Sequence, residues 1–503
     1  MLKWITGGKP DHPLADPKQA RALLADLPPY DAVKAVEEIT RWLESLPDAE
    51  GFKLDRLYEI IELLDGAARG HHRKILTDYL TTSRQQKFNE NKLWTAGYQY
   101  ARALGAAYLT CARQYEQGAA GAAAIRKQMP VIVARALRAL GMQVKWTMLR
   151  YGPFEPGLWT SIGELYGYAL KGGYARSMLA VYSGPQGSSS VEQDYLKIMM
   201  LWASSADGLP PLKQEIAERT AVLLADAFKL ETAPFAGAIY RFDPAQNRPP
   251  TRIFQDAAPG AVAHYFGPGA APARLAELIG SVERTGKLPA DFNLGAAYSD
   301  ESVLSVLRHL GAYWSDTPPA RLSERRPASA RITVVPGYAQ LVDELEKDES
   351  DALNFSVSGA ESWIVENVSD GGYGALMPAA TTDWIRVGEI IGVQLEGSGE
   401  WGIGAVRRVT RDEQRQYHVG IQMLARSVRL VRIAHAASRD PEPAILLSAE
   451  EVPTAEVGVL LRAGRFDANH QIAIQLSDRD VIMNPVGMIT AGDDFDWASY
   501  SPA

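Results

Sequence analysis

Helical periodicity marks the first half of the chain. Between residues 31 and 46, apolar side chains recur every three or four positions, which lines one face of a helix; they are Val33, Val36, Ile39, Leu43 and Leu46. Prolines just before and just after this segment punctuate its two ends. Residues 54–64 repeat the spacing, and residues 75–80 suggest a third helix. We therefore predict a helical domain over residues 1–235.

Helix pairs separated by glycine and proline fill residues 159–228. Such pairs suggest a tetratricopeptide-like solenoid, whose repeat is about 34 residues long. No clean self-match at that period is present, so an irregular helical domain is the preferred interpretation and a solenoid the alternative. Residues 189–192, Ser-Ser-Val-Glu, have the form of a capping box and predict a helix start.

The pattern then changes twice along the chain. Residues 236–320 combine two short strand-like segments, 238–242 and 262–266, with two helical segments, 273–285 and 302–314, which predicts a mixed α/β connecting region. From residue 332 the apolar runs are short and bounded by turn residues, as in strands; they cover residues 332–335, 363–365, 387–395, 401–409 and 417–423.

A second set of strand-like segments follows residue 440. It comprises residues 444–448, 457–461, 472–476 and 481–483, and it predicts a small C-terminal β unit over residues 440–503. Residues 435–443 contain two prolines and are predicted to be a polar linker. The fold class is therefore an α+β multidomain protein, with an all-α domain preceding antiparallel β-structure.

The clearest candidate chemistry lies in residues 363–374, Trp-Ile-Val-Glu-Asn-Val-Ser-Asp-Gly-Gly-Tyr-Gly. Asn367, Ser369 and Asp370 supply short polar groups that hydrogen-bond turning backbone. Gly371 and Gly372 allow positive φ and the close approach of another molecule. The segment predicts a strand–turn–strand corner that exposes an amide and a hydroxyl at its tip.

Four arginines precede the first of these strands: Arg321, Arg325, Arg326 and Arg331. A guanidinium group binds phosphate through two parallel hydrogen bonds and stacks on aromatic bases. Taken alone, the arginines fit an ordinary solvated linker, and the polar turn fits a common Asx-type turn. Their occurrence together and in this order favours a ligand site.

The two motifs are Arg-x-x-x-Arg at residues 321–325 and Asn-x-Ser-x-x-Gly at residues 367–372. In this order they resemble the PilZ domains, bacterial receptors for cyclic di-GMP. The resemblance covers roughly residues 321–434 and implies an antiparallel β-barrel. It also implies that cyclic di-GMP is bound by arginines of the linker and by Asn367, Ser369, Gly371 and Gly372 of the barrel.

The chain departs from the family pattern in two places. The gap between Arg325 and Asn367 is longer than usual, and the acidic run at residues 343–351 fills it as a surface loop or a short helix. The family motif has two arginines, whereas four are present here. Arg331 directly precedes the strand, as the second arginine of the family motif often does.

The resemblance implies a cytoplasmic cyclic di-GMP receptor whose helical domain passes the signal to a protein partner of unknown identity. In the alternative, the barrel no longer binds nucleotide and the chain is a scaffold that works by protein–protein interaction. The departures from the family pattern motivate this alternative.

Net charge, cysteine count and the length of apolar runs exclude several classes of protein. A formal net charge of −8 disfavours a general nucleic-acid binder, and a single cysteine suits a reducing cytoplasm. No apolar run reaches the roughly 18 residues of a membrane span, and the N-terminus does not read as a signal peptide. We expect no metal site, no cofactor and no enzymatic activity, because the catalytic motifs are missing.

Several single residues fit structural roles. Cys111 lies in an apolar run and is predicted to be a small buried residue. His71 and His72 lie among basic residues and are predicted to face solvent on a helix. His309 and His418 are predicted to be structural.

Overall fold

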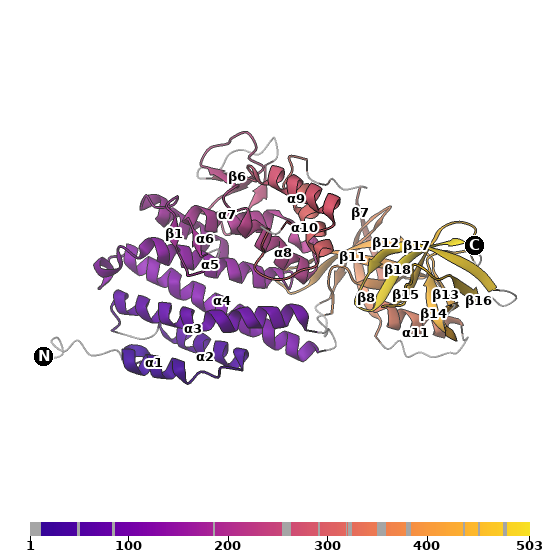
Figure 1. Ribbon diagram of the computed structural model, residues 1–503, viewed down its shortest axis with the longest axis horizontal. Coiled ribbons are helices and arrows are strands. Elements are labelled where there is room, and N and C mark those ends of the chain that lie inside the picture. The colour runs from indigo at the N-terminus through magenta and orange to yellow at the C-terminus, as the bar shows by residue number, and fades with distance from the viewer. Residues whose placement is uncertain are drawn as a thin grey trace. The chain divides into compact units, whose positions relative to one another are not determined.

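The computed structural model describes residues 12–47, 51–82, 86–184, 187–253, 263–289, 292–317, 319, 324–349, 359–378, 384–435, 438–450, 453–475 and 480–503 (Figure 1). The chain divides into two compact units. The first extends to Pro319, apart from residues 151–153 and 207–210. The second consists of those two short segments and residues 320–503.

In the described residues, the first unit begins with eight α-helices, in agreement with the helical domain that the hydrophobic pattern predicted. They are α1 (Pro17–Ala25), α2 (Ala32–Ser45), α3 (Leu54–Thr81), α4 (Lys87–Glu116), α5 (Met129–Met148), α6 (Leu158–Lys171), α7 (Val191–Ala203) and α8 (Pro211–Leu223). Within this unit the helices stack largely in chain order, α3 on α4, α4 on α5 and α5 on α7 (Figure 1). Short 3-10 helices occur at Pro13–Ala15, Ala122–Ile125 and Ala206–Gly208, and β1 (Leu179–Ala180) pairs with β2 (Ser188–Ser189).

Two glycines of α4 allow α5 to pack closely against it. A Cβ atom on Gly97 would lie 2.2 Å from Cζ2 of Trp146, and one on Gly105 would lie 2.7 Å from Cδ2 of Leu140. The Trp94 indole also donates a hydrogen bond of 2.7 Å to the Trp146 carbonyl. Small residues therefore set the spacing of the two central helices.

The remainder of the first unit is a four-stranded antiparallel sheet with two helices. Its strands are β3 (Lys229–Glu231), β4 (Tyr240–Phe242), β5 (Thr251–Arg252) and β6 (His264–Gly267), in the order β3-β6-β4-β5, followed by α9 (Ala271–Thr285) and α10 (Asp300–Tyr313). The sequence predicted only two of these strands. The region also packs as part of the helical unit, whereas the sequence pattern predicted a separate segment over residues 236–320.

The second unit begins with a closed antiparallel barrel. Its strands are β7 (Arg326–Pro336), β8 (Glu361–Ser369), β9 (Gly372–Met377), β10 (Ile390–Leu395), β11 (Trp401–Arg411) and β12 (Tyr417–Ala425), in the order β10-β11-β12-β9-β8-β7. Residues 343–349 of the acidic run lie in α11 (Gly337–Glu349), which follows β7 and buries Leu341 and Leu345, and residues 350 and 351 lie outside the described residues. An inserted helix therefore accounts for part of the long spacing between the arginines and Asn367.

The C-terminal β unit is a second closed barrel. Its strands are β13 (Arg429–His435), β14 (Ser438–Leu446), β15 (Val457–Arg462), β16 (Ile472–Gln475), β17 (Asp480–Ala491) and β18 (Phe495–Pro502). The first barrel ends with β12. Residues 429–434 therefore belong to the second barrel, although the sequence resemblance extended the first barrel to residue 434.

The polar linker predicted at residues 435–443 is wrong, because most of this segment forms β14 and the end of β13. Prolines are tolerated on a strand where one neighbour is missing. Pro443 pairs with Arg432 of β13, but β14 meets its other neighbour, β15, only at Ile445 and Leu446. The prolines therefore occupy the part of β14 with a single neighbouring strand.

Single-residue predictions had mixed outcomes. Cys111 is buried, and burial raises the pKa of its thiol to about 12, as expected for an inert residue. The solvated position predicted for His72 is wrong: its ring is buried and accepts a hydrogen bond of 2.9 Å from the Trp146 indole. Burial and the nearby Lys145 lower the pKa of His72 to about 4. The capping box begins at Ser190 with Gln193, one residue later than predicted.

In the described part of the chain, no helix is both long and apolar enough to cross a bilayer.

A histidine links β12 to the bulged end of β8. Nδ1 of His418 lies 3.1 Å from Oε2 of Glu366, and Nε2 lies 3.3 Å from Oδ2 of Asp412. Partial burial opposes charging of the ring, but the hydrogen bonds and charges of the two carboxylates outweigh it and raise the pKa of His418. Both ring nitrogens face an acceptor, which suits the doubly protonated imidazolium.

The inward face of β8 provides a first stability test. Trp363 is fully buried in the first barrel, stacks on Trp384, and donates a hydrogen bond of 2.9 Å to Glu361, whereas the adjacent Ile364 is 38% exposed. Trp363→Ala should cost about 3–5 kcal/mol because it leaves a large cavity. Ile364→Ala, the matched control on the opposite face, should cost less than about 1 kcal/mol. Scanning calorimetry would measure both, and equal losses would contradict the strand register.

The His418 contacts predict a pH-dependent contribution to stability. Because the folded-state pKa lies above 6.5, the stabilisation is complete below the unfolded pKa and disappears as pH rises through the folded value. His418→Gln should therefore lower Tm at pH 6 and leave it unchanged at pH 9. The effect should stay below about 1 kcal/mol because the ion pairs are exposed. Thermal unfolding at both pH values measures it, and an equal Tm loss at pH 6 and pH 9 would contradict this assignment.

Candidate functional site

The two sequence motifs meet at one corner of the first barrel. Ser369 pairs with Gly372 to close the β8–β9 hairpin, and Asp370 and Gly371 form its loop. On the other side of β8, Arg326 pairs with Val368, and Pro327 pairs with Asn367. The start of β7 therefore runs beside the Asn-x-Ser segment, so that arginines and polar turn residues remote in sequence become neighbours.

Irregularities in two strands flank Asn367. β7 carries a bulge between Pro327 and Ala330, and β8 carries one between Val365 and Asn367. A bulge inserts one unpaired residue and re-aims the side chains beside it. In β8 that residue is Glu366, which contacts His418. The His418 contact thus holds the bulge that orients Asn367.

The side chain of Asn367 lies against the backbone of β9. A Cβ atom on the opposite residue, Gly374, would come within 2.6 Å of both Nδ2 and Oδ1 of Asn367. Within the described residues, Oδ1 is buried and has no hydrogen-bond partner. Leaving a buried acceptor unpaired costs about 1–3 kcal/mol, so a small reorientation of the side chain that pairs Oδ1 with an N–H donor would be favourable.

The other three barrel residues of the site, Ser369, Gly371 and Gly372, differ in how closely the surrounding atoms pack against them. Among the described residues, the Ser369 hydroxyl makes a single long contact of 3.4 Å to the Gly372 carbonyl, which leaves it able to reorient. Gly371 is open, since a Cβ atom added there would meet no described atom within 4 Å, and its carbonyl accepts from the Met423 amide at 2.9 Å. Gly372 is required by folding itself, because a Cβ atom there would lie 1.9 Å from the Ile421 carbonyl oxygen.

The four arginines occupy different places. Arg321 lies outside the described residues, and Arg325 is exposed immediately before β7. Arg326 begins β7, and its Nη2 lies 3.9 Å from Oδ1 of Asp370, with the two side chains 77% and 90% exposed. Such an exposed pair contributes little, so Arg326 can exchange Asp370 for a ligand at small cost.

Arg331 lies farther from the turn. It pairs with Ile364, three residues before Asn367 on β8, and its Nη1 donates to the Ser362 hydroxyl at 3.4 Å. Three residues of a strand span roughly 10 Å. Arg325 and Arg326 are therefore closer to the polar turn in register than Arg331.

Arg426 is a further guanidinium at this corner that the sequence motifs did not indicate. Its Nη2 donates a hydrogen bond of 2.9 Å to the Asp370 carbonyl. It reaches the turn because β12 pairs with β9, with Gln422 opposite Gly372. No sequence motif marks Arg426, since its position depends on the pairing of strands that are distant along the chain.

The described residues contain no group of three histidine, cysteine, aspartate or glutamate side chains placed to hold a metal ion. The corner therefore offers guanidinium groups, an amide, a hydroxyl and backbone groups. These are the groups that bind phosphate and hydrogen-bond a base edge.

Two protein-family models match the chain. The model "Cyclic-di-GMP receptor FimW, N-terminal domain" matches residues 18–234, and "Cyclic-di-GMP receptor FimW, middle PilZ domain" matches residues 343–429. Together they cover more than half of the chain. No curated protein and no solved structure matches.

The second match confirms the PilZ resemblance. It includes Asn367, Ser369 and Gly372, and it begins after the arginines. The first match corresponds to the helical part of the first unit. The chain therefore belongs to the FimW family of cyclic-di-GMP receptors, with a helical N-terminal domain followed by a PilZ domain.

Proposed function

We propose that this protein binds cyclic di-GMP at the corner formed by the start of β7 and the β8–β9 turn. The observation that carries the proposal is the buried, unpartnered Oδ1 of Asn367. It lies beside Ser369 and at the register where the arginine-bearing segment enters the barrel. A ligand that supplies both an N–H donor and a phosphate would satisfy this arrangement.

Cyclic di-GMP has the required chemistry. Its guanines carry N–H donors on their edges, and one of these would donate to Asn367 Oδ1. Its two phosphodiester groups would accept bidentate hydrogen bonds from Arg325 and Arg326, with Arg321 and Arg331 as further candidates. Guanidinium planes also stack on purines. Ser369 would turn its hydroxyl from the Gly372 carbonyl towards the ligand, and the open Gly371 leaves room for this approach.

Signal output would follow from ordering of the arginine segment. This segment connects the helical unit to the barrel in the chain, so ligand binding would restrict it in an order–disorder switch. The ligand can shift the equilibrium between the disordered and the ordered segment only by the difference between its binding free energies for these two states. The protein would act in the cytoplasm. Its helical domain would bind a protein partner and pass the signal to it. The proposed role is binding, without a catalytic step.

A scaffold without nucleotide binding is the second candidate. The close approach of the Ile421 carbonyl already requires a glycine at position 372. This motif residue is therefore explained by folding alone, which favours the scaffold. The inserted α11 also departs from the usual family spacing. Titration with the nucleotide separates the two candidates.

Calorimetric titration with cyclic di-GMP, with GTP as the comparison, should show saturable and selective binding that weakens with salt. Asn367→Ala and Arg326→Gln should each weaken binding at least tenfold, or about 1.4 kcal/mol, because each removes a direct contact. Arg415→Gln is a matched control, since Arg415 is exposed on the β11–β12 turn of the same barrel.

A flat titration of the folded protein would favour the scaffold. Unchanged affinity in both site variants, with binding retained, would contradict the assignment of the corner. The far-ultraviolet circular dichroism of each variant should match that of the parent protein, because Arg326 is highly exposed and Asn367 is only partly buried.

A further inference from the structure

A second candidate site lies inside the helical unit. A cavity of about 310 Å³ is lined mainly by side chains from α3, α5, α7 and α8. Its volume is at the lower end of the 300–1,000 Å³ typical of ligand pockets. Its lining combines cationic and apolar side chains, including Arg69, Arg73, Lys197, Tyr182, Met142 and Leu76. None of these residues belongs to the barrel corner.

Positive charge exceeds negative charge around this cavity. Six cationic side chains line it: Arg69, Arg73, Arg138, Lys145, Lys197 and Arg219. Four carboxylates face them, namely Asp65, Asp194 and Glu218 in the lining and Glu215 paired with two of the cations. Two positive charges therefore remain without a carboxylate.

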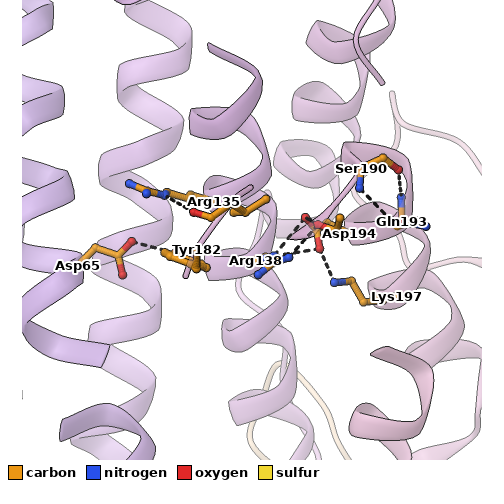
Figure 2. A network of polar contacts seen from close by, with 10 residues as sticks. Asp65, Arg135, Arg138, Tyr182, Ser190, Gln193, Asp194 and Lys197 are labelled. Atoms are coloured by element: carbon orange, nitrogen blue, oxygen red, sulfur yellow. Dashed lines mark hydrogen bonds and ion pairs between the residues drawn. The ribbon is translucent and has the colours of Figure 1, made fainter. Parts of the chain in front are cut away.

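Buried carboxylates on one side of the cavity are each shared between two cations. Asp194 lies 3.1 Å from Arg138 and also pairs with Lys197 (Figure 2). Glu215 pairs with Lys145 and Arg219. The side chains of Asp194 and Glu215 are each 1% exposed. These carboxylates are fully used in holding the cations of α5, α7 and α8 in place.

Asp65 on the opposite side is hydrogen-bonded to tyrosine hydroxyls. Its Oδ2 accepts a hydrogen bond of 2.8 Å from the Tyr182 hydroxyl (Figure 2). It also accepts a hydrogen bond of 2.8 Å from the Tyr108 hydroxyl. Burial raises the pKa of Asp65, which disfavours its charged form. Its acceptor capacity is therefore directed largely to tyrosines.

Arg69 and Arg73 are the cations available to a ligand. They lie four residues apart on α3, so they project from one face of the helix. The Arg69 guanidinium lies 4.0 Å from the centre of the Tyr182 ring. The charge of Arg69 acts on Asp65, but among the described residues neither arginine shares a buried carboxylate as Arg138 and Lys197 do. Arg73 is exposed at the cavity rim.

We propose that this cavity binds a small phosphate monoester of about mononucleotide size. A phosphate monoester carries close to two negative charges at neutral pH, which matches the two unbalanced positive charges. The forks of Arg69 and Arg73 provide bidentate donors to phosphate oxygens. The Tyr182 ring, Met142 and Leu76 provide an apolar surface for the remainder of the ligand.

The test is calorimetric titration of the full-length protein with GMP, with AMP as a second probe and guanosine as the phosphate-free control. GMP and AMP should bind and raise Tm, since a ligand that binds only the folded state stabilises it. Guanosine should bind at least tenfold more weakly. Arg69→Gln and Arg73→Gln should each weaken GMP binding at least tenfold.

Two control variants test whether GMP binds in this cavity. Arg126→Gln should leave GMP binding unchanged, because Arg126 is exposed in the same unit and does not line the cavity. Asn367→Ala should also leave it unchanged. Absence of GMP and AMP binding, or equal binding of guanosine, would overturn the proposal. So would affinity that is unchanged by Arg69→Gln and Arg73→Gln, or affinity lost with Asn367→Ala. Arg73 is exposed, so its variant tests binding without disturbing a buried contact.

Discussion

The contact between Gly372 and the Ile421 carbonyl fixes the register on which the barrel corner depends. With only 1.9 Å available to a Cβ atom, no other residue fits without a shift of β9 or β12. The resulting pairing places Gln422 opposite Gly372 and brings Arg426 to the Asp370 carbonyl. The β8 bulge, held by Glu366 and His418, then turns Asn367 over Gly374. A backbone constraint thus determines where the polar groups of the corner lie, before any ligand is considered.

Local sequence patterns predicted the helices, most barrel strands and the residues of the corner. They succeeded because hydrophobic period and turn residues are properties of short segments. They failed where the pairing of distant strands determines the structure. The prolines of β14 are acceptable because part of this strand lacks one neighbour, and β18 has no pattern that we recognised in the sequence. Arg426 and the His418 contacts were missed as parts of the corner for the same reason. His72 was misplaced because its basic neighbours on the helix concealed an inward-facing position against Trp146.

The two candidate sites use arginine in different ways. At the barrel corner, Arg326 is highly exposed and only weakly paired, so it can move to a ligand. In the helical cavity, the cations of α5, α7 and α8 are held by buried carboxylates, and Arg69 rests on the Tyr182 ring. The first arrangement suits a segment that becomes ordered on binding, and the second suits a pre-formed pocket. Their ligands should therefore differ in size and in phosphate chemistry.

Amide hydrogen exchange with and without cyclic di-GMP tests the central claim most directly, because it reports on residues at the corner. We predict slower exchange in residues 321–331 and 367–374 on addition of the nucleotide, and no such change with GTP. The first segment contains the arginines and the second contains Asn367 and Ser369, and the two strands are joined where Arg326 pairs with Val368. Protection confined to other strands, or no change at saturating nucleotide, would contradict the assignment of this corner as the receptor site.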